Sequence, residues 1–304
     1  MKKLLLFFVF LSPFWLTAQS DSLTHSASSP LQQLEVAMKS LALTVLTDSI
    51  QQNRLEAHEQ LKTKMQEALQ MPGSFDYPFA ELPSISFQYP DDRSFRVVTW
   101  QLYVDMNTYR YAGYLQSNAP QPQLTVLMDR ANEVEDPEYD ILDADHWFGA
   151  VYYNIKSFNH PEGRRYLLFG FNGYQLFHKR KFIDVLSFDQ GVPVFGATVF
   201  QSNEPNRPDL AKNRLVLTYS AETYVRLNYD ENLSLIVFDN LLVGAGALKG
   251  QGPVMLPDGS YCGYQLKKGN WVYVDKLFDH TYDSAPRPQP VLGNGRKGKN
   301  VFGN

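Results

Sequence analysis

Cysteine is nearly absent from this sequence, and its absence limits how the fold can be held together. Cys262 is the only cysteine in 304 residues, so no disulfide can form within the chain. The stability of the protein must therefore come from packing, and a chain of this length has enough residues to bury a substantial core.

A marked excess of charge of either sign is also missing. The chain has 28 Lys and Arg residues against 32 Asp and Glu residues, which gives a formal net charge of -4. Nucleic acid and anionic membrane surfaces bind basic patches, and this balance supplies no basic excess. We therefore expect no nucleic-acid partner, whereas an unknown protein or glycan partner remains open.

Long apolar runs are absent after the first residues of the chain. Lys2 and Lys3 precede the almost wholly apolar run from Leu4 to Leu16, and the small residues Thr17 and Ala18 follow it. This pattern predicts a signal peptide over residues 1–18. The run is too short to span about 30 Å of hydrocarbon, and the alternative, an N-terminal membrane anchor, lacks a stop-transfer pattern. We expect an exported protein, periplasmic or extracellular, with no transmembrane anchor after processing.

A flexible leader and a helical element are predicted next. Residues 19–30 are rich in Ser and Thr and offer little to bury, which indicates a flexible leader. Over residues 31–71 apolar side chains recur at spacings of three and four, as on one face of a helix. They are Leu31, Leu34, Met38, Leu41 and Val45, followed by a weaker stripe at Leu55, Leu61, Met65 and Leu69. We expect two helices, or one interrupted helix, docked on the rest of the fold.

Residues 75–283 change to an alternation of period two, which predicts a β domain. The 20 Phe and 18 Tyr residues support this, because aromatic side chains favour strands. Many short strands separated by turn residues, without helical segments between them, favour antiparallel pairing. The expected strands include 95–103, 109–116, 150–155, 165–169, 181–188, 194–200, 214–219, 224–229, 233–238, 261–266 and 271–274.

The predicted fold class is therefore mainly β, with antiparallel multi-stranded sheets and an N-terminal helical element. The sheets could form a sandwich, a barrel or an irregular propeller-like arrangement, although no repeat of about 40 to 50 residues supports a regular propeller. Residues 284–304 hold Pro286, Pro288 and Pro290 among Gly, Asn, Lys and Arg, which predicts a disordered tail.

Several segments of the β region form a recognisable pattern. They are SFDYPF at 74–79, WFGA at 147–150, FGFNG at 169–173, KFIDVLSF at 181–188, PVFGA at 193–197 and GSYCGY at 259–264. Over roughly residues 74–275 the chain resembles an uncharacterised family of exported bacterial proteins, in which Trp is more usual near Phe171 and Asp at Cys262. The resemblance implies export and a shared fold; it implies no mechanism, because no activity is assigned to the family.

The acidic segment from Glu133 to Asp145 suggests a calcium site, because calcium prefers oxygen ligands. Its spacing does not match an EF-hand, which needs ligands at alternate positions, a central Gly and a late Glu. A solvated acidic loop is the simpler interpretation. His146 follows Asp145, but adjacent residues of a strand point to opposite faces, so we expect no hydrogen bond between them and no partner that would make His146 a general base.

Other recognisable chemistry is missing from the sequence. The remaining histidines after the signal peptide, His25, His58, His160, His178 and His280, form no pair at metal-binding spacing. No nucleophile motif is present, and Cys262 is expected to be a small buried thiol on a strand. The segment from Gly244 to Gly250 lacks the Gly-Lys-Ser/Thr end of a phosphate loop, which favours a flexible turn. We assign no catalytic, cofactor-binding or metal-binding residue and expect no cofactor.

Aromatic side chains give a better functional lead than any of these motifs. A surface built from them would stack on sugars or peptides, although most are expected to be half-buried sheet residues. The candidates are Tyr103, Tyr109, Tyr111, Tyr114, Tyr152, Tyr153, Tyr174, Tyr261, Tyr264 and Trp271. The sequence therefore favours an exported, non-catalytic structural or interaction module. The alternative is a hydrolase acting on an envelope or extracellular polymer, so whether the protein is an enzyme stays open.

Processing of the signal peptide gives the first testable prediction. The mature protein is expected to begin at Gln19, because the charged start, the apolar run and Ala18 together form a cleavage signal. N-terminal sequencing of the protein purified from its native envelope or medium checks this. Met1 at the terminus of membrane-bound protein would contradict it.

Overall fold

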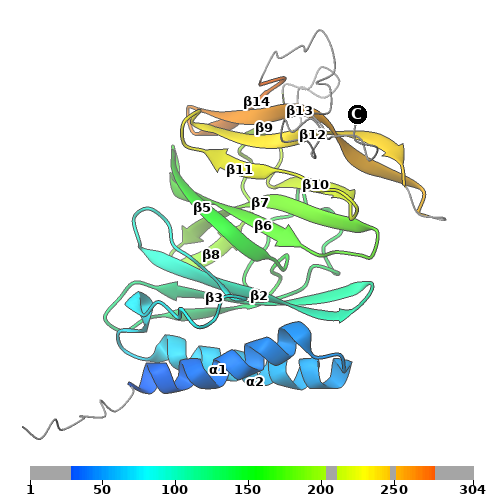
Figure 1. Ribbon diagram of the computed structural model, residues 1–304. Helices are drawn as coiled ribbons and strands as arrows, with labels where there is room; N and C mark the ends of the chain where they lie inside the picture. Colours follow the sequence, from blue (N-terminus) through cyan, green and yellow to red (C-terminus); the bar gives the residue numbers. More distant parts are fainter. Residues whose placement is uncertain (1–28, 203–210, 247–250, 278–304) are drawn as a thin grey trace, which may run out of the picture.

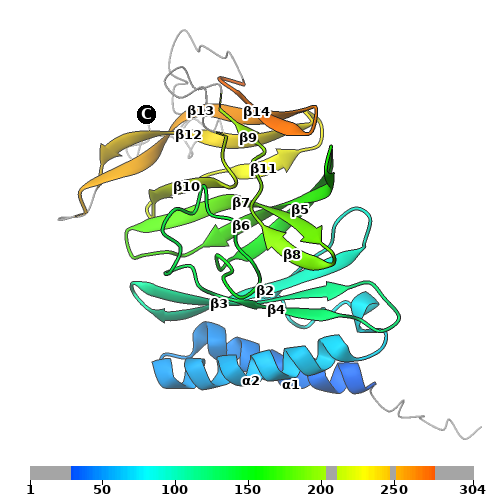
Figure 2. The same ribbon diagram turned by 180° about the vertical axis from the view of Figure 1, so that it is seen from behind.

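The computed structural model describes residues 29–202, 211–246 and 251–277, and within these ranges the chain forms two helices and three stacked β-sheets. Figure 1 shows the order of the layers, from the helices through the first and second sheets to the third. The view from behind in Figure 2 shows the same order. The predicted fold class is confirmed, because the chain is mainly β and its sheets are antiparallel, with the helices near the N-terminus. None of these three sheets closes into a barrel.

The predicted signal peptide and the predicted tail lie outside the described residues, as does nearly all of the predicted leader. Within the described ranges, neither helix is both long enough and apolar enough to cross a membrane. The layers described below therefore concern the part of the chain that begins at Ser29.

The helix layer consists of α1 (Pro30–Thr47) and α2 (Gln51–Gln70), where the spacing of apolar residues predicts helices. Helix α1 begins after Ser29, whose side-chain oxygen accepts a hydrogen bond from the backbone N–H of Gln32. Each helix buries one stripe against the first sheet, with Met38 on α1 and Leu61 on α2 fully buried. A short 3-10 turn, η1 (Ser74–Asp76), follows.

The first sheet has the order β1 (Ser86–Gln88), β2 (Phe95–Asp105), β3 (Thr108–Ser117) and β4 (Leu124–Met128). Successive side chains of a strand point to opposite faces. Val98 and Trp100 of β2 therefore pack on the helices, whereas Phe95 and Val97 pack on the second sheet. The first sheet is thus buried on both faces.

The second sheet has the order β10 (Leu215–Ser220), β7 (His178–Asp189), β6 (Gly163–Asn172) and β5 (Val151–His160), and β8 (Val192–Phe195) also pairs with β7. Leu168 of β6 faces the first sheet and Leu167 faces the third. A sheet that is covered on both faces needs apolar side chains at odd and even positions alike. This explains the continuous buried run from Tyr166 to Gly170 in β6.

The third sheet has the order β11 (Leu227–Asp230), β12 (Leu235–Ala245), β13 (Pro253–Lys267), β14 (Asn270–Val274) and β9 (Phe200–Gln201). Strands β9 and β14 are parallel, with Phe200 opposite Trp271, whereas the other pairs in the sheet are antiparallel. Ile236, Phe238 and Tyr264 of this sheet pack on the second sheet.

The sequence is misleading at two places where a strand was expected to begin, continue or end. Residues 194–200 were expected as one strand, but Gly196 has a φ of 105°, which ends β8 and separates it from β9. Pro257 to Gly259 are residue types of a turn and precede the expected strand 261–266, but they lie inside β13, where the pairing with β12 shifts register and Gly259 has a φ of 88°. They form an irregularity of the ladder, which uses the same residue types as a turn. Of the predicted glycine-rich turn, Gly244 lies inside β12 and residues 247–250 lie outside the described part of the chain.

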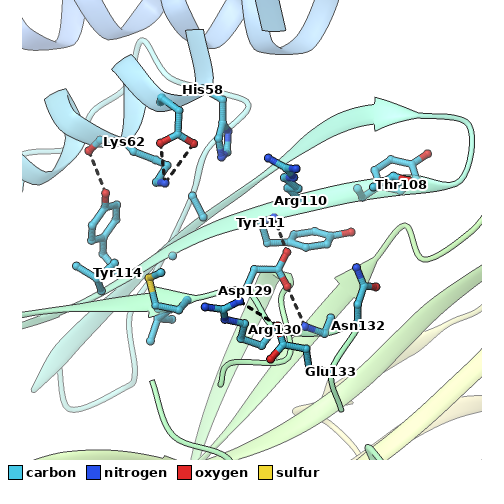
Figure 3. Close-up of a pocket in the computed structure, with 18 residues that line it drawn as sticks. His58, Lys62, Thr108, Arg110, Tyr111, Tyr114, Asp129, Arg130, Asn132 and Glu133 are labelled. Carbon is cyan, nitrogen blue, oxygen red and sulfur yellow. Dashed lines mark hydrogen bonds and ion pairs between the residues drawn. The ribbon is translucent and has the colours of Figure 1, made fainter. Parts of the chain in front are cut away.

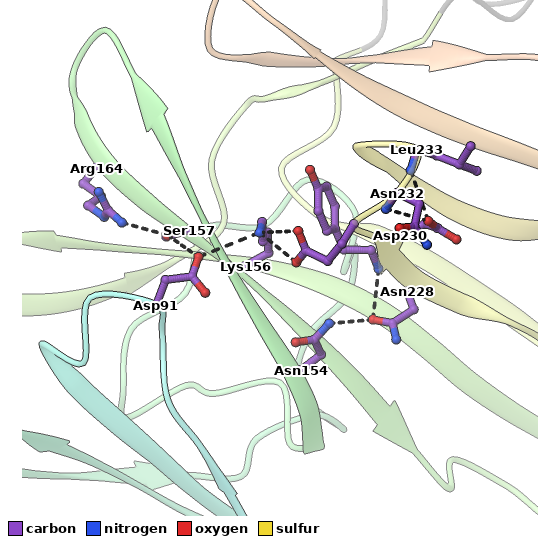
Figure 4. A network of polar contacts seen from close by, with 11 residues as sticks. Asp91, Asn154, Lys156, Ser157, Arg164, Asn228, Asp230, Asn232 and Leu233 are labelled. Atoms are coloured by element: carbon purple, nitrogen blue, oxygen red, sulfur yellow. Dashed lines mark hydrogen bonds and ion pairs between the residues drawn. The ribbon is translucent and has the colours of Figure 1, made fainter.

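Polar contacts along one side of the molecule join all three sheets (Figure 4). Lys156 of β5 donates to Glu231, in the turn between β11 and β12, at 2.8 Å, and its ammonium lies 3.8 Å from Asp91, which precedes β2. Asn154 of the same strand donates to Asn228 of β11 at 2.7 Å. Strand β5 is thereby fastened to both neighbouring layers.

A fully buried ion pair joins Asp184 of β7 to Arg214, which immediately precedes β10. The Arg214 Nε–H donates to Asp184 Oδ1 at 2.9 Å, and the guanidinium also donates to the backbone carbonyls of Pro137 and Phe195. Tyr152 donates its phenol to the second Asp184 oxygen. Arg214 therefore fixes the loop that follows the first sheet onto the second sheet.

Replacing one member of this pair is expected to lower the free energy of unfolding by far more than the net contribution of the intact pair to it. Asp184→Asn or Arg214→Met alone should lower the free energy of unfolding by about 3–5 kcal/mol, because each leaves a buried charge without its counterion. The double variant should lose clearly less than the sum of the two losses. Urea unfolding of the four proteins measures this coupling, and strictly additive losses would contradict it.

Candidate functional site

A cleft of about 450 Å³ lies between α2, the start of β3 and the loop that follows β4 (Figure 3). The cleft exists because β3 extends beyond the end of β4. Strand β4 pairs with β3 only from Ala112 to Gln116, so the stretch from Thr108 to Tyr111 has β2 on one side and no described strand on the other. We call this site the β3 cleft.

Backbone groups of β3 face the β3 cleft. The N–H of Tyr111 donates to Asp129 Oδ2 at 2.9 Å, so it points away from β2. In an antiparallel pair, hydrogen-bonding groups two residues apart point the same way. The N–H and C=O of Tyr109 therefore also point away from β2, and no described strand pairs with them, so they present a strand edge to the cleft.

Asp129 holds the floor of the β3 cleft together. Its Oδ1 accepts the N–H of Ala131 at 3.2 Å while its Oδ2 accepts that of Tyr111, so both oxygens are engaged. Burial raises the pKa of Asp129, and these two backbone hydrogen bonds oppose the rise. The carboxylate also abuts Gly149, where any side chain would collide with it. Asp129 thus serves as a brace between β3, the loop after β4 and the start of β5.

Three cations line the same cleft, and they differ in their partners. Lys62 pairs with Glu59 at 2.9 Å, and Arg130 pairs with Glu133 at 2.9 Å. The exposed Arg110 makes no ion pair with any described residue. Figure 3 shows it between α2 and the loop of Asp129. Arg110 therefore remains available to an anionic group from outside.

The expectation that His146 in the acidic segment has no partner is wrong. His146 has a partner, Asp143, whose Oδ1 lies 2.8 Å from His146 Nδ1, because the chain turns here and brings residues three apart together. This hydrogen bond lowers the pKa of Asp143. Both side chains are more than half exposed, and no group of three or more potential metal ligands occurs in the described ranges. The pair closes a surface turn.

The rest of the acidic segment is tied to the fold. Glu138 pairs with Lys212 at 2.9 Å, and its backbone carbonyl accepts the N–H groups of Asn213 and Arg214. The acidic segment is therefore solvated only in part. Its side chains vary in exposure, and its backbone is anchored to the fold.

Cys262 is buried on β13, as predicted, and its sulfur accepts the phenol O–H of Tyr273 at 2.9 Å. Burial raises the pKa of this thiol. The aromatic candidates do not form one surface. Tyr111, Tyr114, Tyr152, Tyr264 and Trp271 are buried in three separate layers of core.

Comparisons with models of protein families, with characterised proteins and with solved structures found no match to this chain. The functional argument therefore depends on the residues of the molecule itself.

His58 is a lining residue of the β3 cleft that makes the fold sensitive to acid. It is buried on α2, its Nδ1 accepts the indole N–H of Trp100 at 3.3 Å, and burial lowers its pKa to about 4. An unfolded histidine titrates near pH 6.5, so below that pH the unfolded chain binds a proton that the native protein refuses. The stability contributed here is complete above about pH 6.5 and is lost as the pH falls towards 4.

The loss at this histidine is expected to amount to about 3 kcal/mol. His58→Gln keeps an acceptor for Trp100 and cannot titrate, so its stability should fall by that much less than the parent's between pH 7 and pH 4. Urea unfolding at the two pH values measures both changes. Equal acid sensitivity in the two proteins would contradict the assignment.

Proposed function

We propose that the protein is an exported, non-catalytic interaction module that binds an extended peptide segment along the free edge of β3. Export is inferred from the signal-peptide pattern of residues 1–18. The binding role is inferred from the β3 cleft.

The observation that supports binding over hydrolysis is how the carboxylates of the β3 cleft are used. Glu59 and Glu133 are in ion pairs, and both oxygens of Asp129 accept backbone N–H groups. Hydrolysis by paired carboxylates needs one acid and one base that face the same bond and exchange protons. In this cleft the carboxylates are committed to the protein, so the hydrolase alternative finds no support in it.

The groups that remain free in the β3 cleft fit an extended peptide. A strand edge with outward N–H and C=O groups adds a further strand by main-chain hydrogen bonding. Arg110 lies beside that edge and offers a guanidinium to an acidic side chain. The proposed ligand is therefore an extended segment that carries Asp or Glu.

A display library of random linear peptides tests this proposal on the mature chain. Peptides selected on the parent should be enriched in Asp and Glu, and Arg110→Glu should weaken their binding about tenfold or more, because it replaces an attraction by a repulsion. Lys267→Glu makes the same change of charge at an exposed site on β13 and should have little effect. Failure to select any peptide, or equal binding by both variants, would contradict the proposal.

A further inference from the structure

A second pocket, of about 690 Å³, lies between the second and third sheets. Its lining comes from β5, β7, the approach to β11, β12 and β13, and it shares no residue with the β3 cleft. It lies on the opposite side of the second sheet from the first sheet, since Leu227 in its wall belongs to the core between the second and third sheets. We call it the inter-sheet pocket.

Lys181 of β7 is the unusual residue in the inter-sheet pocket. Its side chain lines the pocket and is only 9% exposed, yet it makes no ion pair and no hydrogen bond with any described residue. Its ammonium lies 4.3 Å from the centre of the Tyr224 ring and 5.5 Å from that of Tyr153. Most of the side chain is buried, but the ammonium is not enclosed and faces the space of the pocket, where the two aromatic faces offset part of the cost of leaving it unpaired.

Other buried cations of this protein show how different Lys181 is. Arg214 has Asp184 and several carbonyls, and Arg96 donates to Gln116, Tyr89 and the carbonyl of Ser74. Lys156 also lies over a tyrosine ring, 4.6 Å from the centre of Tyr229, but it has Glu231 as its counterion. Lys181 has the aromatic contacts without the anion.

The rest of the inter-sheet pocket favours a ligand with hydroxyl groups as well as an anion. Asp239 lines it, and within the described ranges only its Oδ2 is engaged, by the backbone N–H of Arg226. Asn228 contributes an amide. The Arg226 guanidinium is half exposed and lies 3.4 Å from Asp230, which offsets its positive charge. Asp239 would repel a second anionic group but accept a hydroxyl.

Two tyrosines give the inter-sheet pocket flat apolar walls. The phenol of Tyr153 donates to the backbone carbonyl of Leu227 at 2.7 Å, which fixes its ring, and burial raises the pKa of Tyr153, so the phenol stays neutral. Tyr224 is 77% exposed, which leaves its ring open for contact. Sugar rings stack on such tyrosine faces.

We propose that the inter-sheet pocket binds a sugar acid, a uronate residue of a saccharide. The carboxylate of the ligand meets the Lys181 ammonium, its ring lies against Tyr224, and its hydroxyls donate to Asp239 and accept from Asn228. This site is independent of the proposed peptide site, so either proposal can fail without the other.

Calorimetric titration of the mature chain tests the site with three probes: a tetrasaccharide of galacturonate, the corresponding neutral tetrasaccharide of galactose, and a tetra-alanine with a free carboxylate. We expect the galacturonate probe to bind and the other two to bind at least about tenfold more weakly, because only the first has both the carboxylate and the pyranose rings. Equal binding of the neutral saccharide, preference for the peptide, or no binding of galacturonate would each overturn the proposal.

Variants identify the residues responsible. Lys181→Met should weaken galacturonate binding about tenfold or more, and Tyr224→Ala, at an exposed position, should weaken it without affecting folding. Lys156→Met is the matched control, a lysine over a tyrosine outside the pocket, and should bind as the parent does. Lys181→Met should also melt no lower than the parent, since it removes an unpaired charge. Undiminished binding by both Lys181→Met and Tyr224→Ala would overturn the assignment to this pocket.

Discussion

The covering of the second sheet on both faces is the constraint on which the rest of this structure depends. A polar group in the covered middle of that sheet has no water-facing side, so it must find its partner inside the protein. Asp184 and Arg214 satisfy each other, and Tyr152, whose pKa is raised by burial, donates its neutral phenol to Asp184. The partners of such groups come from adjoining segments. Each of these hydrogen bonds or ion pairs therefore fixes one layer or loop of the protein onto another. Lys181 stands out only against this background.

The sequence predicts the elements well because their signals are local. Apolar spacings of three and four indicate the two helices, and alternation indicates β2 and β3 almost to their ends. The stacking of the layers is not predicted. Alternation of apolar and polar residues shows that a strand has two faces, but it does not show which sheet or helix covers each face. Gly196 and Gly259 were misjudged for a related reason. A glycine with positive φ serves a turn, a strand break or an irregular ladder equally well, and the neighbouring strand decides which.

The candidate sites depend on distances that no short motif encodes. Arg110 and Lys181 are ordinary residues in the sequence and become distinctive only through the partners that they lack among the described residues. His58 had a weak signal, because it lies three residues before Leu61 and seven before Met65, on the buried stripe of α2. The pairing of Asp143 with His146 could also be predicted, since residues three apart meet in a turn, whereas adjacency in the sequence points to Asp145.

The parallel pair of β9 and β14 carries a consequence for how the chain folds. Phe200 and Trp271 belong to one sheet edge, yet β10 of the second sheet and three strands of the third come between them in the chain. Contacts between residues distant in sequence form late, because the intervening chain must first be ordered. The helices and the first sheet, by contrast, are built from consecutive segments. The stack should therefore grow from its N-terminal layers, and the third sheet can be completed only after β14 has been synthesised.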